Sequence, residues 1–323
     1  MDPGDRPVGI AIVGATATGK SALALEVGRL LDVEIVSVDS RQVYRGLDIG
    51  TAKPGPAERT RVPHHGLDLV EPDQRYSAGR FARDARRWIE EIRGRGRVPL
   101  LVGGTGFFLR ALTHPLFREP PLPRGAREPL RRYLGALPAG ERRRWLAALD
   151  PVGARRLRQG GGAQREARAL EVALLSGRTL GHWQEQEPAE PRLPLVVAVL
   201  EAGSAWLGPR IEARLADMVR RGLPAEVERL AARYGTGAPA FRTTGYAEFL
   251  PWLEGEATLA EATAAAAAAT RRLARRQRTW FRHQAPEDAL RLDAAGDPAD
   301  AAAAIVAGWR DSGSGPPAPD APR

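Results

Sequence analysis

GATATGKS, residues 14–21, follows the pattern G-x-x-x-x-G-K-[ST] and decides the fold that the sequence predicts. The residues before it, VGIAIVGA (8–15), form a short apolar, β-branched run that is typical of a buried strand. The residues after it, SALALEVGRLL (21–31), repeat apolar side chains at helical spacing. A strand, a glycine-rich turn and a helix N-terminus in this order favour anions, so the motif indicates a phosphate site.

The positions of this loop have separate predicted tasks. Gly14 and Gly19 let the backbone turn tightly, so that successive N–H groups can point at phosphate oxygens. Lys20 adds a positive charge, and the Ser21 hydroxyl is a candidate ligand for Mg²⁺. The complete set of predicted phosphate-binding residues is Gly14, Ala15, Thr16, Ala17, Thr18, Gly19, Lys20 and Ser21.

The composition excludes several classes of protein. The chain has 323 residues and 43% hydrophobic content, enough for one large domain or two smaller ones. It contains no cysteine, which excludes disulfides, thiolate metal sites and cysteine nucleophiles, and its five histidines lack metal-site spacing. No apolar run is long enough for a membrane helix, and a first strand beginning at Val8 leaves no room for a signal peptide. We therefore expect a cytoplasmic protein without membrane contact.

The net charge of +9 favours a polyanionic partner, although an Arg- and Ala-rich composition can also reflect genomic base bias. The positions of the charges are more informative. Residues 124–144 hold seven arginines against two glutamates, and residues 271–282 hold six arginines and no acid. Within the second stretch, Arg275 and Arg278 share one side of a long predicted helix (258–284). A solvated helical face is the alternative, but an all-positive face favours contacts with nucleic-acid phosphates.

Four segments read as buried parallel strands, at residues 8–15, 34–40, 98–105 and 194–201, with helical patterns between them. This alternation predicts an α/β fold with a P-loop NTPase-like parallel sheet, an inserted helical subdomain and C-terminal helices. We expect the core to comprise residues 1–114 and 192–292, the latter including C-terminal helices. Residues 115–191 form the insertion, and residues 293–323 form a last helix and a disordered tail, GSGPPAPDAPR.

Polar residues follow the second and third strands. Asp39 ends the second strand, and in open α/β sheets that edge holds the ligand, so Asp39 is a candidate base or water-mediated magnesium ligand. A capping role is the alternative. After the third strand come Gly103, Gly104 and Thr105 in place of the aspartate typical of ATPases. We expect these glycines to admit a ligand close to the backbone, which favours a transferase with a second substrate over a hydrolytic motor.

Arg210 and Arg214, four residues apart, lie on one face of the helix after the fourth strand. An arginine there can neutralise charge on a departing phosphate, and a solvated helical face is the alternative.

Several of these segments together resemble the tRNA dimethylallyltransferase family. The residues that carry the resemblance are GATATGKS (14–21), SVDSRQVYRGLDIGTAKP (37–54), LLVGGTG (100–106), QREARALEV (164–172), RIEARL (210–215), TGYAEF (244–249) and TRRLARRQRTWFR (270–282). The resemblance implies transfer of a dimethylallyl group from dimethylallyl diphosphate to the exocyclic N6 amine of the adenosine adjoining the tRNA anticodon. It also implies Mg²⁺ as cofactor and the tRNA anticodon stem-loop as partner. No exposed apolar repeat in the sequence demands a protein partner, so we expect a monomer without an obligate one.

The resemblance assigns roles to single residues. Lys20, Ser21 with Mg²⁺, and Arg214 stabilise the departing diphosphate, Asp39 accepts the amine proton, and Thr105 contacts the flipped-out adenosine. The catalytic set is thus Lys20, Asp39, Thr105 and Arg214. Residues 39–42 and 164–168 and Arg131 match tRNA-contacting positions of the family, and Arg275 and Arg278 are added from the charge pattern of the long helix. The predicted tRNA-contacting set is Asp39, Ser40, Arg41, Gln42, Thr105, Arg131, Gln164, Arg165, Glu166, Ala167, Arg168, Arg242, Arg275 and Arg278.

The chain departs from the family pattern at two places. Gly160, Gly161, Gly162 and Ala163 stand where an Asn-Asp pair is usual, and Phe107 and Phe108 stand where many members have an aromatic hydroxyl residue. A phosphate-loop kinase using ATP and a non-catalytic RNA-binding protein with a decayed site are the alternative functions.

Overall fold

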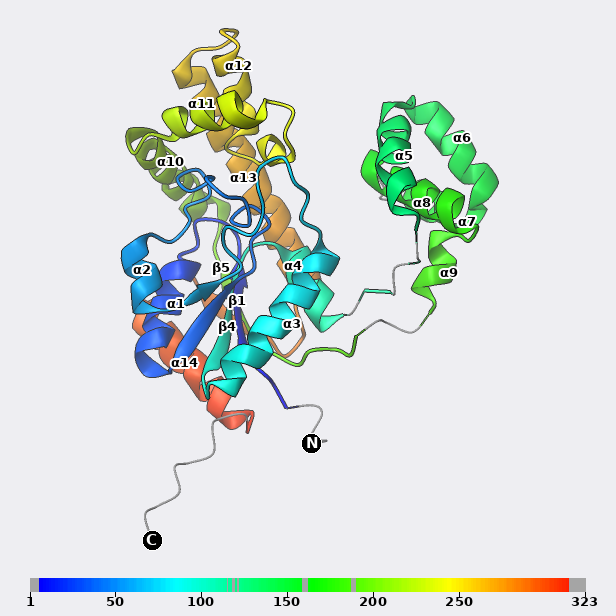
Figure 1. The fold of residues 1–323 in the computed structure, drawn as a ribbon. Helices are drawn as coiled ribbons and strands as arrows, with labels where there is room; N and C mark the ends of the chain where they lie inside the picture. Colours follow the sequence, from blue (N-terminus) through cyan, green and yellow to red (C-terminus); the bar gives the residue numbers. More distant parts are fainter. Residues whose placement is uncertain are drawn as a thin grey trace. The chain divides into compact units, whose positions relative to one another are not determined.

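The computed structural model describes residues 6–114, 116–117, 120, 122–158, 162–186 and 190–313. Its centre is a six-stranded parallel sheet in the order β3-β2-β4-β1-β5-β6 (Figure 1). The strands are β1 (Ile10–Gly14), β2 (Val33–Ser37), β3 (His64–His65), β4 (Val98–Gly103), β5 (Val196–Glu201) and β6 (Leu290–Asp293). The predicted α/β fold with a parallel sheet is confirmed. The edge strands β3 and β6 were not predicted, and they are only two and four residues long.

The register of the central strands brings the candidate residues to one edge of the sheet. Ile12 of β1 pairs with Val102 of β4 on one side and with Ala198 of β5 on the other. Ser37, the last residue of β2, also pairs with Val102. The loops after β1, β2 and β4 therefore leave the sheet at the same edge, where α/β proteins bind their ligands.

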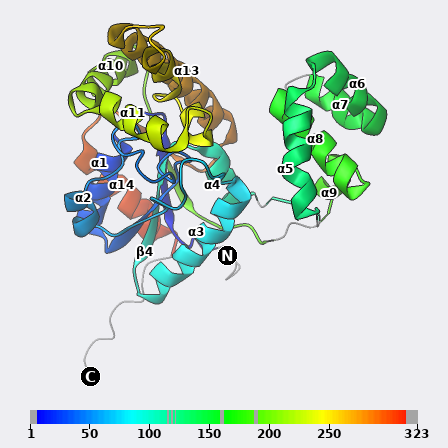
Figure 2. The same cartoon turned by 45° about the horizontal axis from the view of Figure 1, so that its top comes forward.

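Helices cover both faces of the sheet (Figures 1 and 2). On one face α1 (Lys20–Leu30) packs beside α14 (Pro298–Asp311) over a buried apolar cluster that includes Ile12 and Trp309. On the other face lie α3 (Ala78–Gly94) and α4 (Gly106–Thr113). The predicted tail falls almost entirely outside the described residues, because the description ends at Gly313.

The short helix α2 (Pro56–Arg61) lies beside α1 (Figure 2). Further helices lie near the ligand edge of the sheet (Figure 2). They are α10 (Ser204–Arg220), α11 (Leu223–Tyr234), α12 (Leu250–Leu253) and α13 (Leu259–Gln284), with short 3₁₀ turns at Pro239–Arg242 and Ala247–Phe249. Of these, α10 packs along α13, the long helix that contains the whole second arginine-rich stretch, residues 271–282.

The chain divides into two compact units, one of residues 1–113 and 193–323 and one of residues 114–192. The second unit contains α5 (Arg124–Ala136), α6 (Ala139–Leu149), α7 (Pro151–Arg158), α8 (Ala163–Ser176) and α9 (Leu180–Gln184). Leu134, Leu146 and Leu170 form its small apolar core. The two points at which the first unit leads into and out of this insertion are close together, because the Leu193 N–H donates to the Leu112 carbonyl at 3.0 Å.

Candidate active site

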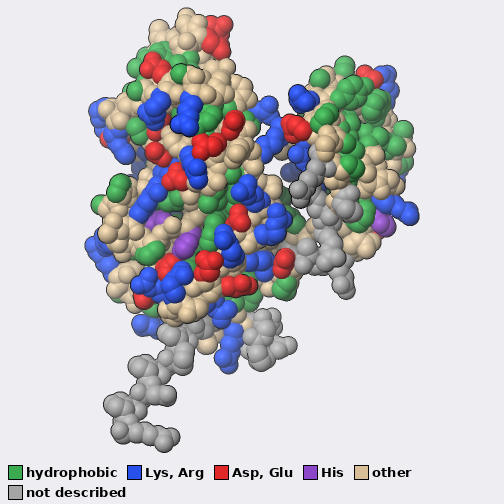
Figure 3. All heavy atoms as spheres, in the orientation of Figure 1, with side chains coloured by type: hydrophobic (Ala, Val, Ile, Leu, Met, Phe, Trp, Pro, Cys, Tyr) green, Lys and Arg blue, Asp and Glu red, His purple; other side chains and the backbone are tan. Residues whose placement is uncertain are grey.

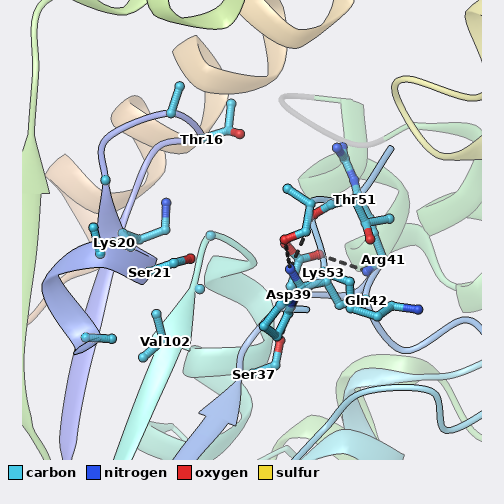
Figure 4. Close-up of a pocket in the computed structure, with 18 of the residues that line it drawn as sticks. Thr16, Lys20, Ser21, Ser37, Asp39, Arg41, Gln42, Thr51, Lys53 and Val102 are labelled. Atoms are coloured by element: carbon cyan, nitrogen blue, oxygen red, sulfur yellow. Dashed lines mark hydrogen bonds between the residues drawn. The ribbon is translucent and has the colours of Figure 1, made fainter. Parts of the chain in front are cut away.

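A cavity of about 780 Å³ opens at the carboxyl ends of β1, β2 and β4. Lys20, Asp39, Thr105 and Arg214, the four residues predicted to be catalytic, all line it, and so does Ser21. Figure 4 shows Lys20 and Ser21 on one wall and Asp39 and Arg41 on the wall opposite. The structure therefore brings together residues from four separate segments of the sequence.

The phosphate loop adopts the conformation that its glycines permit. Gly14 has φ 150° and lies so close to β5 that an added methyl group would be 2.5 Å from the Leu200 carbonyl oxygen, and Gly19 has φ 92°. The Lys20 ammonium donates to the Ala15 carbonyl at 2.5 Å. Burial, with a smaller contribution from the nearby charge of Arg214, lowers the pKa of Lys20 to about 7. A diphosphate bound in the loop would favour the charged form of Lys20 and so raise this pKa again.

The opposite wall is held by contacts between Asp39, Ser40 and Thr105. One Asp39 carboxylate oxygen accepts the Arg41 N–H at 2.9 Å, so Asp39 does cap the end of its strand as well as lining the cavity. The Thr105 hydroxyl oxygen accepts the Ser40 N–H at 3.0 Å and lies 3.2 Å from the Ser40 hydroxyl. Thr105 thus ties the loop after β4 to the residue that follows Asp39.

The two arginines of α10 have different surroundings. Arg214 lines the cavity and is exposed to the solvent that fills it. The surrounding walls still remove part of its hydration, which lowers its pKa. The charge of Asp39 opposes that shift, and the charge of Arg41 adds to it. Arg210 instead donates to the Ala17 carbonyl at 3.2 Å and lies over the Trp206 ring, 4.2 Å from its centroid. Arg210 also lines the cavity, and its hydrogen bond to Ala17 supports the phosphate loop.

The glycines at the end of β4 permit close packing of protein, and Gly103 and Gly104 also line the cavity. A methyl group on Gly103 would overlap the Val38 carbonyl, and one on Gly104 would lie 2.5 Å from the Gln277 side-chain nitrogen. A methyl group on Gly106 would overlap the Trp280 ring. The close approach of α13 therefore requires Gly104 and Gly106, and the approach of a ligand to this backbone stays a prediction.

Some residues predicted to contact tRNA in the first unit have internal partners. Gln42 accepts from the Ser37 hydroxyl at 2.8 Å and donates to two carbonyls of residues 51–52. Arg278 donates to the Ser204 hydroxyl at 2.5 Å and lines a second cavity of about 490 Å³. Arg242 and Arg275 are exposed. Basic and acidic side chains are interspersed on the face of the molecule in Figure 3.

In the second unit, a buried glutamate forms ion pairs with two of the arginines predicted to bind tRNA. Glu171 forms ion pairs with Arg131 at 2.9 Å and Arg168 at 3.1 Å. Glu166, itself a predicted tRNA contact, is buried and paired with Arg142 and Arg143. The Glu166 carboxylate therefore holds α6 and α8 together, and a contact of this residue with tRNA stays a prediction.

The neighbours of that glutamate in α8 lie differently. Gln164 and Arg165 are exposed on the first turn of α8, and Ala167 is half-buried. Gly160 and Gly161 fall outside the described residues.

Residues outside the prediction also shape the cavity. Gln277 of α13, the helix that contains the second arginine-rich stretch, lines it. From the sequence one can tell only that Gln277 does not share the helix side of Arg275 and Arg278. Lys53 is only 1% exposed and donates to Tyr44, Asp48 and Asp68, at 2.7 Å each. Lys53 therefore stabilises the loop that forms one wall.

Within the described ranges, no group of three or more His, Cys, Asp or Glu side chains is arranged to hold a metal ion. A magnesium ion held by one hydroxyl, water and substrate phosphates needs no such cluster, because Mg²⁺ commonly retains several waters. Ser21 and Asp39 both line the cavity and offer the hard oxygen atoms that Mg²⁺ prefers, so the residues present fit this ion. None of the helices in the described parts of the chain is long and apolar enough to cross a membrane.

The chain matches two family models, one described as IPP transferase over residues 42–284 and one described as isopentenyl transferase over residues 9–64. It is 46% identical over 280 residues to a tRNA dimethylallyltransferase of Halorhodospira halophila, covering 85% of this chain and 90% of the relative. It is 44% identical over 314 residues to that of Methylibium petroleiphilum, covering 92% of each.

Solved structures agree with these matches. A tRNA isopentenylpyrophosphate transferase from Bacillus halodurans is 32% identical, with a TM-score of 0.68 and coverage of 94% of this chain and 97% of that one. A eukaryotic dimethylallyltransferase acting on tRNA is 26% identical, with a TM-score of 0.81 and coverage of 97% and 82%. Fold and matches together define a prenyltransferase built on a phosphate-loop sheet. The chain belongs to the tRNA dimethylallyltransferase family.

Proposed function

We propose that this protein transfers a dimethylallyl group from dimethylallyl diphosphate to the N6 amine of the adenosine adjoining the anticodon of tRNA. The products are N6-isopentenyladenosine and diphosphate. The observation that carries the proposal is one shared cavity, which the phosphate loop, Arg214, Asp39 and Thr105 all line. Lys20 and Ser21 lie opposite Asp39 across it (Figure 4). Such a cavity can hold the donor and the reacting base together.

The phosphate-loop wall suits the departing group. As the allylic C–O bond breaks, negative charge grows on the diphosphate, and Lys20 and Arg214 both border the space where it would lie. Ser21 would hold Mg²⁺, which supplies further positive charge at the diphosphate when it is bound. In this proposal the phosphate loop binds a diphosphate that leaves, not a phosphoryl group that is transferred.

The opposite wall suits the acceptor. The amine nitrogen forms the new C–N bond and must lose a proton, for which Asp39 is the candidate base. Thr105, fixed to Ser40, is the candidate contact for the base. An adenine stacked in an anticodon loop reaches such a cavity only when it is flipped out.

The tRNA backbone requires basic surface beyond the cavity. Exposed arginines of α13, such as Arg275, and of the unit 114–192 are the candidates. We propose that this unit is the tRNA-binding subdomain and that the enzyme acts as a monomer. A tRNA acceptor supports a cytoplasmic location.

The test is mass spectrometry of nucleosides from unmodified tRNA incubated with the protein, Mg²⁺ and dimethylallyl diphosphate. We expect N6-isopentenyladenosine at the position next to the anticodon, and none when the donor is omitted. ATP and dimethylallyl diphosphate are compared as ligands of the same preparation. Tight ATP binding without prenyl diphosphate binding would contradict the proposal and favour a kinase.

A further inference from the structure

The Gln277 side chain connects two loops that are remote from it in sequence. Its carbonyl oxygen accepts the Thr16 N–H of the phosphate loop at 2.9 Å. Its amide nitrogen donates to the Gly104 carbonyl, in the loop after β4, at 2.8 Å. Both contacts lie at the cavity wall, because Thr16, Gly104 and Gln277 all line it. One amide therefore spans the gap between the loop proposed for the donor and the loop proposed for the acceptor.

Local packing holds this bridge in place. Gly104 has no side chain where Gln277 lies, and Gly106 has none where the Trp280 ring lies. Thr105 lies between these two glycines, so α13 packs against the residue on each side of it. Ser40 holds the Thr105 side chain through hydrogen bonds. Movement of Gln277 would be transmitted to Thr105 through the backbone and to the phosphate loop through Thr16.

We propose that Gln277 is a positioning residue that fixes the separation of the phosphate loop and the Thr105 loop, and so aligns donor and acceptor for prenyl transfer. The inference rests on the proposed function. Transfer between two bound substrates depends steeply on their alignment, and a misplacement of about 1 Å can cost about 100-fold in rate. The same helix carries Arg275, a proposed tRNA contact, so α13 links the tRNA surface to both loops.

Only an amide satisfies both contacts. A glutamate at this position would accept from Thr16 but would turn a carboxylate oxygen toward the Gly104 carbonyl. A methionine has similar length and makes neither hydrogen bond. Gln284 offers a matched control, because it lies in the same helix, is exposed, and makes only surface hydrogen bonds, accepting from Arg110 at 2.6 Å and donating to the His283 carbonyl at 3.1 Å.

The test compares Gln277→Met with Gln284→Met by steady-state kinetics of full-length protein, with dimethylallyl diphosphate and tRNA varied in turn. For Gln277→Met we expect kcat to fall about 10- to 100-fold, with both KM values within about threefold of wild type. Gln284→Met should keep wild-type kcat. Because a loss of folded enzyme would also lower the apparent kcat without changing KM, each rate is expressed per donor-binding site, counted by calorimetry with dimethylallyl diphosphate. Near-wild-type kcat in Gln277→Met, or an equal loss in Gln284→Met, would overturn the inference.

A double-mutant cycle keeps the inference testable if Gln277→Met folds poorly. Gly104→Ala removes the same bridge from the other side, because its methyl group displaces the Gln277 amide. If both changes act through one bridge, the kcat losses of Gly104→Ala and Gln277→Ala do not multiply in the double variant. Multiplying losses would show two separate effects and overturn the inference. Wild-type protein that forms no isopentenyladenosine would instead contradict the proposed function itself.

Discussion

Asp39 combines a structural contact with a proposed chemical one. It accepts the Arg41 N–H and also lines the cavity, and substitution can separate the two roles. Asparagine keeps an oxygen for the Arg41 N–H but cannot take a proton from the amine. We expect Asp39→Asn to lower the single-turnover rate about 10²- to 10⁴-fold while leaving the Kd for tRNA within about threefold.

Asp39→Ala is the comparison for this experiment, because it removes the hydrogen bond to the Arg41 N–H as well as the base. A tRNA affinity that falls in Asp39→Ala but not in Asp39→Asn would show that this hydrogen bond shapes the tRNA-binding surface. A near-wild-type transfer rate in Asp39→Asn would show that another group takes the proton.

Glu34 in β2 is a buried carboxylate whose ion pairs make the stability of the protein depend on pH. Its carboxylate is 3% exposed and binds Arg95 through two hydrogen bonds of 2.8 Å, with Arg97 and His65 also in contact. The Arg95 hydrogen bonds, together with those from His65 and Arg97, outweigh burial and lower the pKa of Glu34 to about 2.

A pKa lowered in the folded state stabilises the protein above the ordinary pKa of 4.5, and the stabilisation is lost as pH falls toward 2. The shift corresponds to about 3 kcal/mol. We expect the difference in unfolding free energy between wild type and Glu34→Gln to shrink by about this amount between pH 5.5 and pH 2. Urea titrations at several pH values measure it, and a difference independent of pH would contradict the assignment.

At the scale of elements, α11 supports the loop that forms one wall of the cavity. The Glu226 side chain, in a residue only 2% exposed, accepts three backbone N–H groups of Asp48, Ile49 and Gly50 and the Tyr246 hydroxyl. Burial, with a further contribution from Glu226, raises the pKa of Tyr246. Residues 51–55, which follow directly, line the cavity. The position of this wall therefore depends on a helix far along the chain.

We expect Glu226→Gln to lower the unfolding free energy by roughly 2–5 kcal/mol, because an amide cannot accept all four hydrogen bonds and leaves buried donors unpaired. Thermal and urea unfolding measure this loss. Glu228→Gln in the same helix is the control, because Glu228 is exposed and should change stability by less than about 0.5 kcal/mol. Equal effects of the two substitutions would contradict the role given to Glu226.

Prediction from the sequence succeeded where the signal was local. The strand, the phosphate loop and α1 are contiguous, so their pattern can be read from residues 8–31 alone. The edge strands β3 and β6 are too short to show a periodicity. The roles of Gln277 and Glu226 depend on contacts with residues more than 170 positions away, which leave no local pattern. At Gly104 the sequence identified a close approach but not the helix that makes it.

At the scale of the whole molecule, the division into two units has consequences for RNA binding. In the unit 114–192, the buried Glu166 and Glu171 form ion pairs with Arg127, Arg131, Arg142 and Arg143, so the number of arginines overstates the charge available to a phosphate backbone. The surface arginines that remain determine the salt dependence of tRNA affinity. The unit is held by its own apolar core, and its removal need not disturb the sheet.

Replacing residues 114–192 by a short Gly/Ser linker tests this division, because the hydrogen bond between Leu193 and Leu112 places the two ends side by side. The phosphate loop lies entirely in the remaining unit, so we expect the Kd for dimethylallyl diphosphate to stay within about threefold. The Kd for tRNA should rise at least about 10-fold, and the slope of log affinity against log salt should flatten by about 0.7–0.9 for each tRNA phosphate that the shortened protein no longer neutralises. Calorimetry with the donor and filter binding at several salt concentrations measure both. An unchanged slope would assign the tRNA surface to the sheet unit, whereas abolished donor binding would show that the two units do not fold independently.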